Sequence, residues 1–156
     1  MNEEAKSITI LMADDDEDDR LMAEVALKEA KLLNPIRFVK DGEELLDYLY
    51  RRGIYGNGTD APRPGLILLD LNLPKKSGKD VLETIKSDEK LKHIPVVVLT
   101  SSKAELDVVK SYNLHANGYI IKPVNMEKFM EIVQSIEQFW FNIVVLPDKG
   151  DVTGVS

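Results

Sequence analysis

The sequence contains no cysteine, and aromatic residues make up only 6% of its 156 residues. Without cysteine, the chain can form neither disulfide bonds nor thiolate metal sites. It also has no apolar run that approaches the ~20 residues of a membrane span. Its first residues do not have the basic, apolar and small-residue layout of a signal peptide. We therefore expect a soluble, cytoplasmic protein with no membrane partner.

An excess of basic residues is missing as well. Lys and Arg number 20 against 27 Asp and Glu, which gives a formal net charge of −7. Because an acidic protein repels phosphate backbones and anionic lipid, we expect no direct binding to nucleic acid. The length suits one domain and leaves no room for a separate output module. We expect the domain to span residues 1–140, followed by a C-terminal extension over residues 141–156.

The rest of the chain is organised around the stretch Leu66–Pro74. Its apolar run, Leu66–Leu69, is typical of a short strand that is buried on both faces. The run stops at Asp70, and Pro74 closes the loop that follows. In an open parallel α/β sheet, sites form at the carboxyl ends of the strands. Asp70 is therefore a candidate functional residue.

Five apolar segments with strand character alternate with five segments of helical periodicity. The strands are expected at Ser7–Ala13, Ile36–Val39, Leu66–Leu69, Val96–Leu99 and Tyr119–Ile121. The helices are expected at Asp18–Leu32, Glu43–Tyr50, around Val81–Ile85, around Leu106–Tyr112 and at Asn125–Phe139. This alternation predicts an α/β fold in which helices cover both faces of a parallel sheet.

Two segments lie outside this alternation, and each leaves two interpretations open. Arg51–Gly65 is rich in Gly and Pro, which indicates either a solvated insertion or a loop that recognises a partner. Near the C-terminus, Phe139–Phe141 and Ile143–Leu146 add apolar residues after the last helix. This tail either folds back on its own domain or forms an arm that docks on a second copy of the chain.

Polar residues follow four of the expected strands, always at the carboxyl end. Asp14 and Asp15 follow the first strand, Asp70 the third, Thr100 the fourth and Lys122 the fifth. Three carboxylates brought together repel one another unless a cation lies among them. Oxygen ligands that include carboxylates suit Mg²⁺. The pattern therefore predicts a magnesium site at this edge of the sheet.

Such a site is suited to phosphoryl transfer. Mg²⁺ would withdraw charge from an incoming phosphoryl group, while Lys122 and the Thr100 hydroxyl could bind its oxygens. Asp70 would then be the nucleophile and would form an aspartyl phosphate. The alternative is a binding module that acts without phosphate.

Three other sites that use carboxylates or phosphates fit less well. A phosphatase with an Asp nucleophile needs a second Asp two positions later as general acid, and Asn72 occupies that position. A calcium loop that begins at Asp14 needs Gly and Glu where Asp19 and Val25 occur. No Gly-x-Gly-x-x-Gly sequence follows any expected strand, which argues against a dinucleotide site.

The strand-end motifs resemble those of the receiver domain of two-component response regulators. They are Asp14-Asp15, Leu69–Pro74, Leu99–Ser101 and Ile121–Pro123, and their order and spacing match the family over about Ile8–Phe139. The resemblance implies a flavodoxin-like, doubly wound (βα)5 fold with strand order 2-1-3-4-5. It also implies that the protein is not an enzyme but accepts a phosphoryl group from the phosphohistidine of a histidine kinase.

The resemblance implies a role for each motif residue. Asp70 is the phosphorylated residue. Asp15, Asp70 and the backbone carbonyl of Asn72 bind Mg²⁺ directly, and Asp14 acts through a water molecule. Lys122 contacts the phosphoryl group.

Two further properties follow from the same resemblance. Thr100 and Tyr119 form a switch pair, in which the Thr100 hydroxyl moves toward the phosphorylated aspartate and the Tyr119 ring turns into the vacated space. The peptide bond between Lys122 and Pro123 is cis.

Within the family, three segments resemble the single-domain regulators that are paired with phytochrome-type histidine kinases. They are Arg51–Gly65, Leu71–Gly78 and Phe139–Pro147. We therefore expect a phytochrome-type kinase as partner, a homodimer formed through the last helix and Phe139–Leu146, and output by protein contact or onward phosphotransfer.

Overall fold

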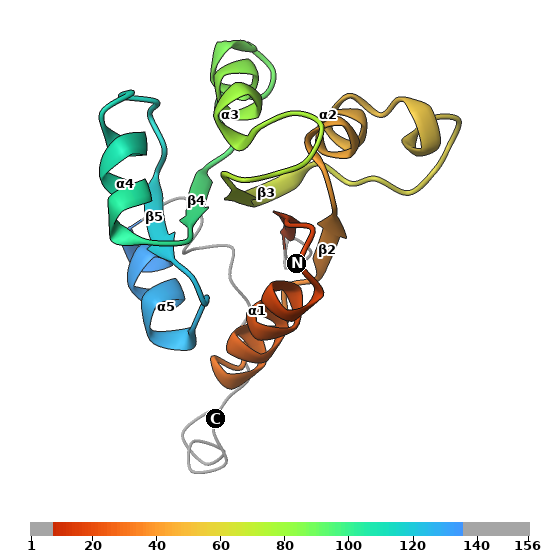
Figure 1. Ribbon diagram of the computed structural model, residues 1–156. Helices are drawn as coiled ribbons and strands as arrows, with labels where there is room; N and C mark the ends of the chain where they lie inside the picture. The colour runs from red at the N-terminus through yellow and green to blue at the C-terminus, as the bar shows by residue number, and fades with distance from the viewer. Residues whose placement is uncertain (1–7, 136–156) are drawn as a thin grey trace, which may run out of the picture.

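Residues 8–135 are described by the computed structural model, and within them five parallel strands form one sheet in the order β2-β1-β3-β4-β5 (Figure 1). The strands are β1 Thr9–Ala13, β2 Ile36–Val39, β3 Pro64–Asp70, β4 Val96–Thr100 and β5 Gly118–Ile121. The helices are α1 Glu17–Glu29, α2 Gly42–Tyr50, the 3-10 helix η1 Gly53–Tyr55, α3 Gly78–Ser87, α4 Lys103–Lys110 and α5 Met126–Ser135. The expected flavodoxin-like fold and strand order are confirmed.

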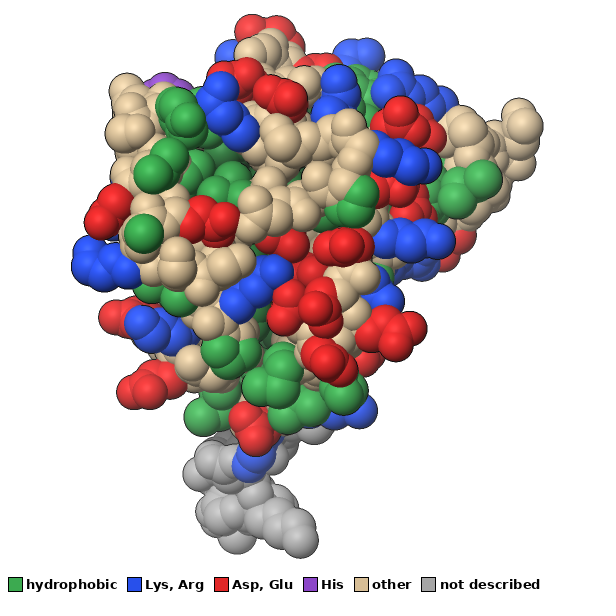
Figure 2. All heavy atoms as spheres, viewed as in Figure 1, with side chains coloured by type: hydrophobic (Ala, Val, Ile, Leu, Met, Phe, Trp, Pro, Cys, Tyr) green, Lys and Arg blue, Asp and Glu red, His purple; other side chains and the backbone are tan. Residues whose placement is uncertain are grey.

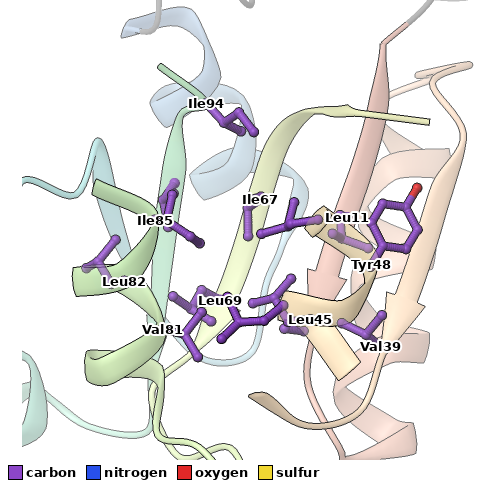
Figure 3. Packing of buried hydrophobic residues seen from close by; sticks show 14 of the residues in the cluster. Leu11, Val39, Leu45, Tyr48, Ile67, Leu69, Val81, Leu82, Ile85 and Ile94 are labelled. Atoms are coloured by element: carbon purple, nitrogen blue, oxygen red, sulfur yellow. The ribbon is translucent and has the colours of Figure 1, made fainter. Parts of the chain in front are cut away.

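Helices cover both faces of the sheet because the strand side chains alternate between them. On one face, strand residues pack with α2 and α3 (Figure 3): Leu11, Val39, Ile67 and Leu69 meet Leu45, Tyr48, Val81, Leu82 and Ile85. On the other face, strand residues pack with α1 and α5: Ile10, Met12, Leu66, Leu68, Val97 and Leu99 meet Ala23, Leu27 and Phe129. The central strands are thus buried on both faces, as the apolar run Leu66–Leu69 predicts.

Element ends differ from expectation by a few residues. The third strand begins at Pro64 rather than Leu66, since Pro64 pairs with Thr9 of β1. The first helix ends at Glu29 rather than Leu32, shortly before Lys31 adopts a left-handed φ of 61°. The fourth helix ends at Lys110, before Tyr112.

Three large apolar residues of α1 lie outside the core. Leu21, Met22 and Val25 are 57%, 42% and 40% exposed. The buried residues of α1 are Ala23, Ala26 and Leu27. Of the residues whose spacing predicts this helix, Leu21, Met22 and Val25 therefore form an apolar surface, and Figure 2 shows hydrophobic side chains gathered over α1.

The Gly- and Pro-rich segment between α2 and β3 is held against the domain. The Tyr48 hydroxyl donates a hydrogen bond to the Pro62 carbonyl over 2.8 Å, and the rings of Tyr48 and Tyr55 meet edge to face. Arg37 on β2 forms an ion pair of 2.6 Å with Asp60. These contacts attach the insertion to α2 and β2.

Several expectations concern residues outside the described range. They are the start of the first strand at Ser7, the end of the last helix at Phe139 and the tail 141–156 with its dimerisation arm. Among the described residues, none of the helices is long and apolar enough to cross a bilayer.

The loop between β3 and α3 returns the chain to the end of β3, so that α3 begins close to Asp70. The Ser77 side chain caps α3 by accepting the Asp80 N–H. The Gly78 N–H donates to the Leu71 carbonyl over 3.0 Å. A Cβ atom on Gly78 would lie 2.5 Å from the Asp70 carbonyl oxygen, so glycine allows α3 to begin next to the end of β3.

Replacing Gly78 tests this close contact. We expect Gly78→Ala to lower the free energy of unfolding by about 2 kcal/mol, because backbone atoms must shift to admit the methyl group. Urea denaturation followed by circular dichroism measures the change. The matched control is Gly56→Ala, whose Cβ would meet its nearest atom at 3.4 Å. Equal stability of Gly78→Ala and the wild type would contradict the expectation.

Candidate functional site

The strand order brings the carboxyl ends of β1 and β3 together. The chain leaves β1 toward β2 on one side and returns to β3 on the other, so the crevice between β1 and β3 is the topological switch point of the sheet. Ala13 pairs with Leu69, and Asp70 pairs with Leu99. The carboxylates of Asp14 and Asp70 therefore emerge side by side.

One ammonium group serves three carboxylates at this edge. Lys122 Nζ lies 3.0 Å from Asp70 Oδ2, 3.1 Å from Asp14 Oδ2 and 2.7 Å from Asp19 Oδ2. Burial alone would lower the pKa of Lys122, but its hydrogen bonds to Asp19 and Asp70 outweigh that effect and raise the pKa above its ordinary value. Lys122 is therefore a fixed positive charge beside Asp70.

The negative charge of the buried Asp14 carboxylate is only partly compensated by its neighbours. Its side chain is fully buried, and its Oδ2 atom accepts no hydrogen bond from the described residues although Lys122 is near. Burial raises the pKa of Asp14 from 3.8 to about 6 against the lowering effect of the Asp16 N–H, which donates to Oδ1, and the charge of Asp70 adds to the rise. A buried oxygen of this kind suits a cation.

The donor set fits a hard divalent ion. Oxygen atoms of Asp14, Asp15 and Asp70 all lie within 4.8 Å of one another. Asp15 is exposed at the mouth of the group, so a bound ion could keep water ligands there. These three residues could hold a divalent cation, which would offset the excess of carboxylates over the single ammonium.

Asp70 is fixed from both sides. Its side chain is 3% exposed, Oδ1 accepts the Asn72 N–H over 3.0 Å, and Oδ2 faces Lys122. The hydrogen bonds described for Asn72 are made by its backbone N–H and its side-chain amide. Its carbonyl oxygen as a metal ligand stays a prediction. The geometry allows a nucleophilic carboxylate beside a cation site.

Thr100 ends β4, and Tyr119 lies on the neighbouring strand β5, where it pairs with Val98, two residues before that end. Thr100 is fully buried, and its hydroxyl has no hydrogen-bond partner among residues 8–135. Tyr119 is half-buried, and Lys110 Nζ lies 5.5 Å from the centre of its ring. The Lys122–Pro123 peptide bond is cis, as expected. The structure thus brings every predicted strand-end side chain to one edge.

Two further residues contribute to this edge and were not predicted from the sequence. Asp19 lies in the first turn of α1 and forms the shortest of the Lys122 contacts. Glu105 lies in the first turn of α4, and its carboxylate accepts hydrogen bonds from Asn72 Nδ2 and the Ser101 N–H, both over 2.6 Å. Their position in a first helical turn directly after a strand-end motif was the available signal.

Known proteins are similar to this chain in sequence. Residues 10–134 match the family model described as the response regulator receiver domain. The response regulator Rcp1 of Synechocystis sp. is 46% identical over 140 residues, which cover 90% of this chain and 92% of Rcp1.

Solved structures agree with the sequence match. The bacteriophytochrome response regulator RtBRR has a TM-score of 0.81 at 42% identity, over 92% of this chain and 84% of its own. The phosphorylated cyanobacterial phytochrome response regulator RcpA has a TM-score of 0.69 at 43% identity, over 92% and 100%. The Mn²⁺-bound form of Rcp1 has a TM-score of 0.68 at 42% identity, over 90% and 99%.

The strand order, the Lys122 cluster and the relatives all lead to one assignment. The chain belongs to the response regulator receiver family, and its members are signalling proteins.

Proposed function

We propose that Asp70 accepts a phosphoryl group from the phosphohistidine of a histidine kinase, with Mg²⁺ bound beside it. The observation that carries this proposal is the contact of 3.0 Å between Lys122 Nζ and Asp70 Oδ2, next to the buried Asp14 oxygen that accepts no hydrogen bond from residues 8–135. A nucleophile, a fixed cation and a set of metal ligands are what phosphoryl transfer requires.

The transfer forms one bond and breaks one. A carboxylate oxygen of Asp70 bonds to phosphorus while the bond between phosphorus and the histidine nitrogen breaks, and the imidazole keeps that electron pair. Lys122 then compensates charge on the phosphoryl oxygens, and the Thr100 hydroxyl donates to another of them. A bound divalent ion supplies further charge compensation. The protein is therefore a phosphoacceptor whose own aspartate gains and loses phosphate, rather than an enzyme acting on other molecules.

Mg²⁺ is the cation that we propose. Asp15 and Asp70 would bind it directly together with the Asn72 carbonyl oxygen, and Asp14 would act through a water molecule. Small oxygen-rich sites that leave room for water suit Mg²⁺. The Mn²⁺-bound structure of Rcp1 supports a divalent ion in a related protein.

We propose a phytochrome-type histidine kinase as the partner and the cytoplasm as the location. The support is the likeness to Rcp1, RtBRR and RcpA, of which the last two are named as phytochrome regulators. The exposed side chains of Leu21, Met22 and Val25 on α1 offer an apolar surface for a protein partner. With a net charge of −7, the chain is not suited to direct binding of nucleic acid.

Phosphorylation would change the face formed by α4, β5 and α5. The buried Thr100 hydroxyl turns toward the phosphoryl group, and the Tyr119 ring moves into the vacated space. Shifting such a face from 1:99 to 99:1 requires ~5.5 kcal/mol, which a doubly charged group held by Lys122 and a metal ion can supply.

Acetyl phosphate and intact mass spectrometry test the proposal. We expect the wild type to gain the mass of one phosphoryl group in the presence of Mg²⁺, because the bound ion and Lys122 compensate the added charge. Asp70→Asn and a chelator-treated sample should gain nothing. Acetyl phosphate can react too slowly to label the wild type, so a sample that gains no mass is next incubated with candidate histidine kinases. If these kinases fail to phosphorylate it as well, the protein is instead a binding module that acts without phosphate.

Asp14 gives a separate test of the metal site. In Asp14→Asn we expect the melting temperature without metal to rise by about 4 °C, because a buried charge is removed while Lys122 keeps two carboxylates. Mg²⁺ should raise the melting temperature of the wild type but not of the variant. Differential scanning calorimetry measures both. The control is Glu17→Gln, because Glu17 belongs to the same run of consecutive acidic residues, Asp14–Asp19. An equal Mg²⁺ effect in Asp14→Asn would contradict the assignment.

We also propose that the domain spans residues 1–140 and that residues 141–156 form an extension used in a homodimer. The support is the apolar composition of Phe139–Phe141 and Ile143–Leu146. A chain that ends at Gln138 should sediment as a monomer, because the apolar arm is removed, whereas the full chain should sediment as a dimer. If both chains sediment with the same number of subunits, the proposed homodimer through residues 139–146 is wrong.

A further inference from the structure

Glu105 connects two loops at the mouth of the site. It is the third residue of α4, and its N–H donates to the Ser102 side chain that caps this helix. One carboxylate oxygen accepts the Ser101 N–H, and the other accepts Asn72 Nδ2, both over 2.6 Å. Glu105 therefore links α4 and the end of β4 to the loop that follows Asp70.

Helix capping alone does not explain these contacts. In a capping box, the third helical residue accepts the N–H of the cap residue, which is Ser102 in α4. Here Glu105 reaches one residue further back, to Ser101. Its second oxygen binds Asn72, which is 33 residues away in sequence. The carboxylate thus holds groups of the site itself.

The Ser101 N–H faces the side of β4 on which Asp70 lies. Backbone groups of a parallel strand alternate between its two neighbours. Leu99 accepts from Leu71 after β3, whereas Thr100 accepts from Lys122 after β5. The next residue, Ser101, is therefore directed back toward β3. Its N–H is a donor that a group attached to Asp70 could use.

We propose that Glu105 is a latch of the unphosphorylated state, and that a phosphoryl group on Asp70 displaces its carboxylate from the Ser101 N–H. This inference rests on the proposed phosphorylation of Asp70. The phosphoryl group adds about two negative charges, and its oxygens accept hydrogen bonds from nearby N–H and O–H groups. Its charge also repels the Glu105 carboxylate. Both groups cannot occupy the same N–H.

Release of the latch acts on α4. When the carboxylate leaves Ser101, its contact with Asn72 is strained or lost as well, because both oxygens belong to one rigid group. The first turn of α4 then loses its connection to the loop after β3. Phosphorylation thereby reaches the α4 surface by a route that does not involve Tyr119.

Glu105→Gln tests the latch, because it removes the charge and keeps the size of the side chain. We expect it to bind beryllofluoride, a phosphoryl mimic, about three- to tenfold more tightly than the wild type in the presence of Mg²⁺, since a charge-assisted hydrogen bond no longer competes. Isothermal titration calorimetry measures the affinity. Asp107→Asn is the matched control, because Asp107 lies on the same helix and pairs with Lys103 instead.

Nuclear magnetic resonance of the metal-free protein gives a readout that does not depend on phosphoryl chemistry. The Ser101 amide proton should move upfield in Glu105→Gln and stay in place in Asp107→Asn. A residue that only stabilised α4 would lower the melting temperature when replaced and would leave beryllofluoride affinity unchanged or weaker.

The outcomes separate the latch from the proposed function. Tighter binding by Glu105→Gln together with the Ser101 shift supports the latch. If the wild type binds beryllofluoride and Glu105→Gln binds it equally or more weakly, the latch is wrong while the phosphoacceptor proposal survives. If the wild type binds no beryllofluoride at the Asp70 site, both proposals fail.

Discussion

The sharing of one buried ammonium among several carboxylates is the constraint on which the site depends. Lys122 Nζ lies within 3.1 Å of Asp14, Asp19 and Asp70. One positive charge cannot compensate three negative ones, and the burial of Asp14 raises the cost. The site is therefore suited to take up a cation, and Lys122 has competing partners that can be exchanged when new charge arrives at Asp70.

The fold tolerates this concentration of charge because the apolar core lies away from it. Alternate strand residues fill an apolar core on each face of the sheet, so the carboxyl edge can hold charged groups without exposing the core. At this edge β3 and β4 end with Asp70 and Thr100, and Asp14 and Lys122 directly follow β1 and β5. The switch point between β1 and β3 provides the opening. Tight approaches such as that of Gly78 to the Asp70 carbonyl fix the loops around it.

Much of this site could be predicted from the sequence, because an apolar run that stops at Asp70 or Thr100 places that residue at a strand end by local rules alone. Asp19 and Glu105 could not be placed, since their contacts with Lys122 and Asn72 depend on how helices pack beside strands far away in sequence. The same limit applies to α1, where the spacing of Leu21 and Val25 indicates a helix but packing leaves both side chains exposed.

The most direct test of phosphoryl binding at Asp70 is a crystal structure of the protein with Mg²⁺ and beryllofluoride. We expect beryllium to be bound to Asp70, Lys122 Nζ to have left Asp19 to contact a fluoride, and the Tyr119 ring to have turned toward Thr100. A structure in which Lys122 keeps Asp14, Asp19 and Asp70 as partners while beryllofluoride binds elsewhere would contradict this expectation.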